Sequence, residues 1–196
     1  MQGGSGVVIT IGRKYGSGGK EIGQRLAQRL GIPCHDADLE LRGGENEQFA
    51  AIRAMAAQGP CVIVGFCADH VLSGTEGLIR VFIHCDMDHR VERIVQQYGL
   101  PAGEAGREAL RQDRERARLY GVHTRGKWAD LSRYDLTVDS GPLGIAGTVE
   151  LLSQFVALKV MRRRSGGLLA GNITSGKIAE NRAVQAANSP VVYKIK

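Results

Sequence analysis

Short apolar runs rich in β-branched residues alternate with helical patterns along most of this chain. The first run, VVITI at residues 7–11, has the composition of a buried parallel strand. Similar runs follow at 34–35, 61–65, 78–84 and 135–140, separated by helical patterns that end near 30, 57, 98 and 120. A last helical pattern covers about 143–161. Repeated β–α alternation favours a five-stranded parallel sheet covered on both faces, a three-layer α/β/α sandwich.

The length and composition indicate one globular α/β domain followed by a tail. A chain of 196 residues can bury one sizeable core but not two. Its content of 43% hydrophobic and 23% charged residues is typical of globular proteins. After Arg164 the helical pattern gives way to scattered Gly, Ser and Asn without a sustained period. We therefore expect a domain at 1–164 and a basic tail or arm at 165–196.

The net charge of +6 is concentrated near the C-terminal end. Residues 1–158 carry 18 Lys/Arg and 19 Asp/Glu, whereas residues 159–196 carry 8 Lys/Arg and the single Glu180. The domain itself is close to neutral, which makes nucleic acid an unfavoured partner. The tail is interpreted as a solubilising extension, with contact to an anionic partner as the alternative.

Targeting and cysteine patterns predict a cytoplasmic protein. No uninterrupted apolar run reaches the roughly 18–20 residues of a membrane-spanning helix, and the N-terminal MQGGSGVVITIG lacks the layout of a secretory signal. The cysteines form no CxxC pair and the histidines show no ligand spacing, so we expect reduced thiols and no protein-bound metal site. These residues are Cys34, Cys61, Cys67 and Cys85, and His35, His70, His84, His89 and His123.

A glycine-rich segment at residues 11–23, IGRKYGSGGKEIG, connects the first predicted strand to the first predicted helix. Glycines allow successive backbone N–H groups to converge on phosphate oxygens at a helix N-terminus, and a lysine there balances the phosphate charge. The predicted phosphate-binding residues are Gly16, Ser17, Gly18, Gly19, Lys20 and Glu21. The alternative is a tight strand-to-helix turn that binds nothing.

This segment departs from the GxxxxGK[ST] pattern at two positions. Lys14 stands where the first glycine is expected, and Glu21 stands where a hydroxyl normally ligates Mg²⁺. A Mg²⁺ ion would therefore be held through waters, through Ser17 or through a carboxylate elsewhere.

The chain resembles the bacterial cytidylate kinase-like family of P-loop nucleoside monophosphate kinases. The resemblance begins with TIGRKYGSGGKEIG and GIPCHDADL. It continues through GPCVIVGFCADHVL, RVFIHCDMDHRVERI, RQDRERARLYG and KWADLSRYDLTVDSGPLGIAGTVELL, which together cover most of residues 7–156. The resemblance implies a P-loop NTPase-like fold, ATP as the phosphoryl donor, Mg²⁺, and a pyrimidine monophosphate such as CMP as the acceptor.

Residues 107–118 hold five arginines, and the family's mobile lid over the phosphates corresponds to about 100–130. The resemblance places Asp113 and Arg116 in contact with the nucleotide or the transferred phosphoryl group, with Arg114 beside them. Arg118 is a further predicted substrate contact. Helical periodicity alone would favour a solvated helix with Glu–Arg pairs.

Asp36 and Asp69 follow predicted strands, at the edge where open α/β sheets bind ligands. Either could hold hydrated Mg²⁺ or the acceptor, and the alternatives are a turn residue and a helix cap.

Two departures from the family bear on the acceptor. Phe66 stands where the family typically has an arginine that binds the acceptor phosphate, and the acceptor-binding region is shortened to about 37–58. The glycine-rich segment and the resemblance predict a nucleotide-binding phosphotransferase. The two departures favour the alternative, a degenerate kinase that acts as a non-catalytic nucleotide-binding or interaction module. A homo-oligomer that shares acceptor contacts is left open.

Overall fold

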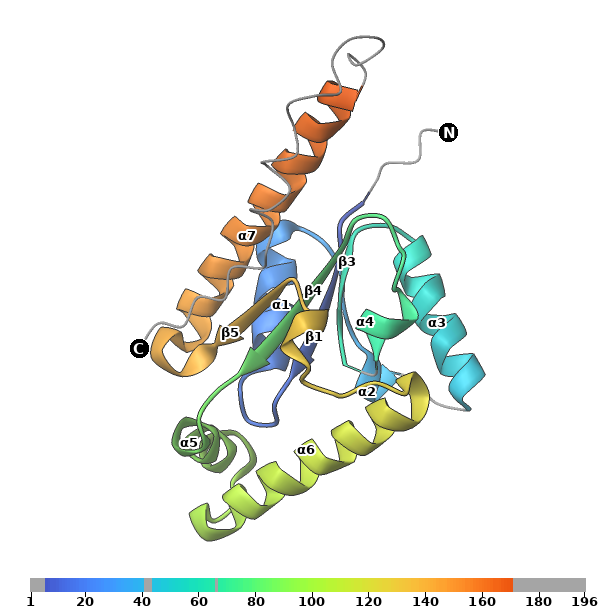
Figure 1. Cartoon of the computed structure of the whole chain (residues 1–196). Helices are drawn as coiled ribbons and strands as arrows, with labels where there is room; N and C mark the ends of the chain where they lie inside the picture. The colour runs from blue at the N-terminus through green and yellow to red at the C-terminus, as the bar shows by residue number, and fades with distance from the viewer. Residues whose placement is uncertain (1–5, 41–43, 66, 171–196) are drawn as a thin grey trace. The chain divides into compact units, whose positions relative to one another are not determined.

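The structure, a computed structural model, describes residues 6–40, 44–65 and 67–170 (Figure 1). At its centre is a five-stranded parallel sheet with the strand order β2-β3-β1-β4-β5. The strands are β1 (Val8–Arg13), β2 (Cys34–Asp36), β3 (Cys61–Val64), β4 (Leu78–His84) and β5 (Leu136–Asp139). All five strands form within a residue or two of the predicted runs, and the prediction of a parallel sheet is confirmed.

Seven helices connect and follow the strands in the described part of the chain. They are α1 (Gly19–Leu30), α2 (Ala37–Glu40), α3 (Glu45–Ala57), α4 (Ala68–Val71), α5 (Met87–Tyr98), α6 (Ala102–Thr124) and α7 (Ser140–Ala170). Gly31 ends α1 in the left-handed conformation that glycine favours, with a φ of 66°. Asp86 caps α5 by accepting a hydrogen bond from the backbone N–H of His89. The one-turn helices α2 and α4 were not predicted, because four residues are too few to show a helical period.

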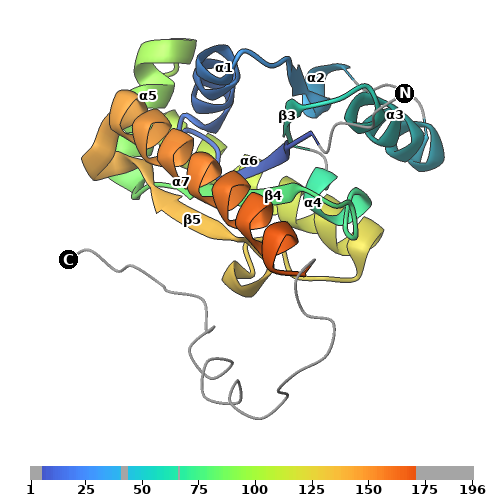
Figure 2. The ribbon, with the colours of Figure 1, turned by 90° about the horizontal axis from the view of Figure 1, so that it is seen from above.

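Side-chain alternation along the strands gives the sheet two buried faces. Val62 and Val64 of β3 lie beneath α1, where a Cβ on Gly23 would approach both. The other face carries Ile63 in an apolar cluster with Ile52 of α3 and Val71 near the end of α4. Figure 2 shows α2 and α3 at the β2–β3 end of the sheet and β5 at the opposite end. Helices on both faces confirm the three-layer arrangement.

The first part of α7 lies beside α1 on the same face of the sheet (Figure 1). An ion pair of 2.6 Å between Arg29 and Glu150 joins the two helices. The helical path is broken near its start at Gly144, whose φ of 61° favours glycine. Regular helix therefore begins close to residue 143, where the sequence predicts it, and Leu152 and Val156 are buried.

The chain divides into two compact units, residues 1–156 and 157–196. The first contains the whole sheet and both pockets described below. In the second, the described residues continue α7 to Ala170. The boundary at 164/165 stays a prediction, and residues 171–196 of the predicted tail lie outside the described residues.

One helix, Ser140–Arg163, is long and apolar enough by length and composition to cross a membrane. The sequence predicts a helix over about 143–161 but not a candidate membrane span, because only uninterrupted apolar runs were counted. This helix interrupts its apolar residues with Gly, Ser and Thr. A core helix of a globular protein passes the same test, so the finding by itself is weak evidence for a membrane span.

Candidate active site

The turn between β1 and α1 has the backbone of a phosphate-binding loop. Gly16 and Gly18 adopt φ angles of 80° and 78°, a region that L side chains rarely occupy. A Cβ on Gly19 would lie 2.5 Å from Cβ of Arg13, so this position has no room for a side chain. The three glycines predicted to form the cradle are thus required by conformation and by space.

Ser17 faces the interior of this turn. Its buried hydroxyl lies 2.8 Å from the carbonyl oxygen of Lys14 and 3.2 Å from that of Ile83. Its own carbonyl accepts a 2.7 Å hydrogen bond from the hydroxyl of Ser140, at the start of α7. The Ser17 side chain thus holds the loop against the end of β4, its carbonyl holds the loop against the start of α7, and its predicted contact to phosphate stays a prediction.

A cavity of about 410 Å³ opens in front of this loop, and we call it the glycine-loop pocket. Nζ of Lys20 lies 3.0 Å from the Asp36 carboxylate at the end of β2. Glu21 also lines the cavity, but its carboxylate is held by Arg93 at 3.1 Å and by Arg25 at 2.7 Å. The lining residues are Arg13, Lys14, Tyr15, Gly16, Gly18, Gly19, Lys20, Glu21, Asp36, Asp38, Arg93, Gln97, Tyr98 and Arg116.

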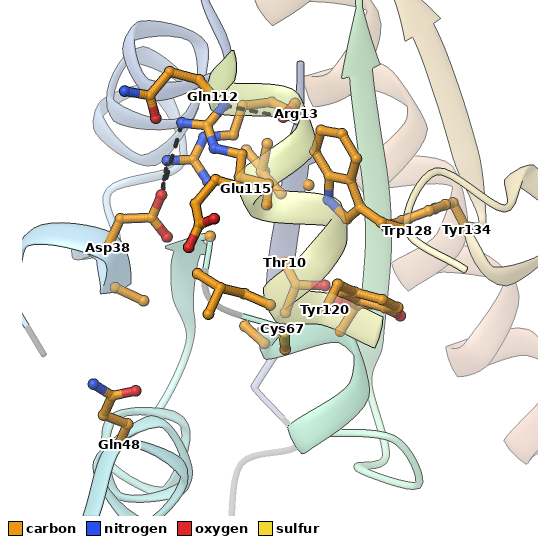
Figure 3. Close-up of a pocket in the computed structure, with 18 residues that line it drawn as sticks. Thr10, Arg13, Asp38, Gln48, Cys67, Gln112, Glu115, Tyr120, Trp128 and Tyr134 are labelled. Atoms are coloured by element: carbon orange, nitrogen blue, oxygen red, sulfur yellow. Dashed lines mark hydrogen bonds and ion pairs between the residues drawn. The ribbon is translucent and has the colours of Figure 1, made fainter. Parts of the chain in front are cut away.

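A second cavity, of about 300 Å³, lies over the carboxyl ends of β1 and β3, and we call it the sheet-edge pocket (Figure 3). Thr10 lines it, and its buried hydroxyl has no hydrogen-bond partner within the described residues. Tyr120 and Trp128 line the side formed by α6 and the segment after it. Gln48 of α3 lines the other side. The cavity thus offers aromatic faces and several hydrogen-bonding groups.

Arg13, Asp38 and Arg116 line both pockets and form their common boundary. One guanidinium nitrogen of Arg13 lies 2.7 Å from the Asp38 carboxylate, and one of Arg116 lies 3.8 Å from it (Figure 3). Burial, and next the charge of Arg13, lower the pKa of Arg116 to about 10, so it remains protonated at neutral pH. Two guanidinium groups thus share one carboxylate where the cavities meet.

Asp113 does not touch either cavity but fixes the loop beside them. It is buried, accepts a 2.8 Å hydrogen bond from the backbone N–H of Tyr15, and forms a 2.7 Å ion pair with Arg90. Nε of Arg90 donates to the carbonyl oxygen of Tyr15 at 2.6 Å, and Nζ of Lys14 lies 3.6 Å from Asp113. Asp113 therefore connects α6, α5 and the glycine loop, which is a positioning role.

The remaining predicted residues divide between the pockets and the surface. Asp69 lines the sheet-edge pocket and accepts a 2.7 Å hydrogen bond from the Tyr120 hydroxyl, whose pKa is raised by burial and by this carboxylate. Arg114 and Arg118 are exposed, and Arg118 pairs with Glu115 at 2.8 Å. Phe66 lies outside the described residues.

Three residues of this region were missed by the sequence analysis: Arg13, Asp38 and Arg90. Arg13 is the last residue of β1, directly before the loop, and that position alone could have identified it. Asp38 and Arg90 have no comparable signal, because their partners are 25 and 23 residues away in the sequence.

The model of the cytidylate kinase-like family matches residues 8–42 and 44–142, which include every strand and the glycine loop. The chain belongs to the cytidylate kinase-like family. A cytidylate kinase of Methanopyrus kandleri is 28% identical over 169 residues, covering 68% of this chain and 84% of that protein. A cytidylate kinase of Methanothrix thermoacetophila is 27% identical over 175 residues, covering 78% of this chain and all of that protein. The chain is thus kinase-like.

Solved structures agree with the fold. An uncharacterized protein from Eubacterium ventriosum superposes with a TM-score of 0.72 at 27% identity, over 77% of this chain and 98% of its own. A gluconokinase from Sinorhizobium meliloti has a TM-score of 0.51 at 18% identity, over 85% and 97% of the two chains. The second likeness supports the α/β fold alone. Together with the five-stranded parallel sheet and the family match, these structures confirm the α/β sandwich of P-loop NTPase-like type expected from the sequence.

Proposed function

We propose that this chain transfers the γ-phosphoryl group of ATP to a nucleoside monophosphate such as CMP. The observation that carries the proposal is the meeting of the two pockets at Arg13, Asp38 and Arg116. Phosphoryl transfer needs a donor and an acceptor in line, with positive charge around the moving group. The glycine-loop pocket would hold the donor and the sheet-edge pocket the acceptor.

The donor side has the groups that triphosphate binding requires. The loop at Gly16–Lys20 opens α1, so its backbone N–H groups and the helix dipole favour the β- and γ-phosphates. Lys20 would exchange its contact with Asp36 for a contact to the phosphate oxygens. Lys20 and the loop N–H groups would thus offset the negative charge of the phosphates, and no covalent bond to the protein would form.

The expected Mg²⁺ also has a fitting oxygen donor. The carboxylate of Asp36 is mostly buried beside Lys20 and lines the glycine-loop pocket, so it can bind hydrated Mg²⁺ through water. Glu21, at the position of the usual hydroxyl ligand, is engaged by Arg93 and Arg25. Bound Mg²⁺ would offset the negative charge of the donor's phosphate oxygens, and Asp36 would orient the hydrated ion.

The acceptor side has charge at one end and hydrogen-bonding groups at the other. Arg13 and Arg116 would bind the acceptor phosphate, and planar guanidinium groups suit bidentate contacts to phosphate. Thr10, with its unpartnered buried hydroxyl, and the Tyr120–Asp69 pair could orient the nucleoside. We propose that the reaction takes place in the cytoplasm, where the four cysteines, none of which forms a disulfide, would stay reduced.

The test is an assay of ADP release with ATP and Mg²⁺ against CMP, dCMP, UMP, AMP and GMP, with a control lacking acceptor. We expect turnover with one or two pyrimidine monophosphates and its loss in Lys20→Ala. Lys127→Ala, at an exposed lysine that lines neither pocket, is the matched control. Turnover without dependence on Lys20 would refute the proposed donor site.

One observation favours the second candidate, a nucleotide-binding module without transfer. The loop carries Glu21 where kinases of this class use a hydroxyl on Mg²⁺, and this carboxylate adds negative charge beside the phosphate site. ATP binding measured by calorimetry, together with no phosphorylation of any of the five monophosphates, would favour this function over the kinase.

A further inference from the structure

A cluster of metal-binding side chains lies outside both pockets, at the carboxyl ends of β4 and β5. Cys85 follows β4, Asp86 is the N-cap of α5, and His89 lies in the first turn of that helix. One ligand atom from each of these residues lies within 4.8 Å of the other two. A thiol, an imidazole and a carboxylate therefore converge on one small volume.

A second part of the chain brings a carboxylate beside this group, although Asp139 is not among the three residues whose ligand atoms all lie within 4.8 Å of one another. Asp139 is the last residue of β5, and its Oδ1 accepts a 3.0 Å hydrogen bond from the backbone N–H of Gly141. A Cβ placed on Gly141 would lie 3.1 Å from Sγ of Cys85, 3.2 Å from Oδ1 of Asp139 and 3.3 Å from Nδ1 of His89. Three donor atoms thus surround a point that is open because residue 141 is glycine.

The absence of a side chain at Gly141 is not explained by its backbone. Its φ is not among the positive values that favour glycine in the described residues, so alanine could adopt this conformation. The methyl group of alanine would occupy the space between Sγ of Cys85, Oδ1 of Asp139 and Nδ1 of His89. Glycine at this position therefore keeps that space open.

We propose that Cys85, Asp86, His89 and Asp139 form a binding site for a divalent metal ion of borderline softness, with Zn²⁺ as the best-fitting ion. Sulfur, nitrogen and oxygen donors from Cys, His and Asp are the ligands of four-coordinate zinc. A thiolate selects against Mg²⁺ and Ca²⁺, which prefer oxygen alone. The bound ion would tie the start of α5 to the turn between β5 and α7.

To accept the ion, the ligand atoms of Cys85, Asp86 and His89, which lie within 4.8 Å of one another, must move closer together, and the Asp139 carboxylate must turn toward them. Zinc bonds of about 2.0–2.3 Å separate tetrahedral ligand atoms by roughly 3.3–3.6 Å. The Asp86 carboxylate and Nδ1 of His89 now share a 2.7 Å hydrogen bond, which would be replaced by two bonds to the metal. Both side chains are about half exposed, so they can rotate, and the ion can reach them from solvent.

The experiment titrates the chelator-treated full chain with Co²⁺, without nucleotide and without oxygen. Cobalt bound to a thiolate gives a sulfur-to-metal charge-transfer absorption, which reports the Cys85 bond directly. We expect one equivalent to produce this band and Zn²⁺ to abolish it by displacement, because Zn²⁺ favours tetrahedral N/S sites. No band in the wild type, or no displacement by Zn²⁺, would overturn the proposal.

Two pairs of variants assign the band to this site. Cys85→Ser should remove it, whereas Cys34→Ser, at a cysteine of β2 that forms no disulfide, should leave it unchanged. Gly141→Ala removes no ligand but fills the space between them, and we expect binding to weaken by about 10- to 100-fold, the range that loss of an outer-shell partner costs. Gly147→Ala, on the same helix, is its control. Wild-type binding by Gly141→Ala, or a band that survives in Cys85→Ser, would refute the site.

Discussion

The buried ion pair between Arg90 and Asp113 gives the sharpest test of how the loop is held. Arg90 is 5% exposed and Asp113 is 7% exposed, and their 2.7 Å contact joins α5 to α6 across the glycine loop. In Asp113→Ala the guanidinium of Arg90 stays buried with no carboxylate beside it. Removing one partner of a buried pair costs about 3–5 kcal/mol.

The expected loss can be measured as unfolding by urea or by heat. For a chain of this size each kcal/mol corresponds to roughly 2–4 °C, so the melting temperature should fall by about 6–20 °C. Asp113→Asn separates the two roles of the residue. Its amide oxygen can still accept from the Tyr15 N–H, but it no longer balances the charge of Arg90.

A double variant decides whether the charge pair is the cause. Arg90→Met combined with Asp113→Leu removes both charges and keeps the volume apolar, so it should be more stable than Asp113→Ala. The reasoning is refuted if Asp113→Ala unfolds within about 1 kcal/mol of the wild type, well below the range for a broken buried pair. It is also refuted if the double variant is no more stable than Asp113→Ala.

Three further predictions follow from the pockets and their surroundings. Arg116→Ala should lower turnover on the order of 10³-fold, whereas exposed Arg114→Ala should match the wild type in the same assay. Asp38→Asn should lower the KM for the acceptor several-fold, since Arg13 and Arg116 lose the carboxylate that competes with phosphate; an unchanged or higher KM would contradict this. Burial, then Asp69 and Asp38, raise the pKa of Cys67 from 9.0 to about 12. The unfolded thiol therefore ionises first, so stability should fall as pH rises from 9 toward 12, and Cys67→Ala should flatten that slope.

The sheet and its helices could be predicted because their signals are local. The run at Val8–Arg13 is apolar and β-branched, the helix after it has an amphipathic period, and Gly31 marks its end. The cap at Asp86 was also visible, since Asp before a helical period is a common N-cap. These features depend on neighbours within a few residues, which a single sequence contains.

The roles of the lid residues could not be predicted in the same way. Periodicity groups arginines on a helix face, but it does not show which face meets the loop. In the structure Arg116 reaches both pockets, whereas Arg114 and Arg118 are exposed on the same helix. Asp113 was assigned to the nucleotide by resemblance, and its actual contacts to Arg90 and Tyr15 depend on how α5 packs against α6.

Because the segment at 37–58 is short, the sequence led us to expect that most of the acceptor-binding region is missing. The lining of the sheet-edge pocket, however, depends little on that segment. The ends of β1 and β3 supply Thr10 and Gly65, and α6 supplies Tyr120. The short segment adds Ala37, Asp38 and Gln48. Most of the lining comes from β1, the segment after β3 and α6, which lie outside the shortened segment. A small acceptor-binding region is therefore compatible with the proposed acceptor pocket, provided that α6 stays where the Arg90–Asp113 pair holds it.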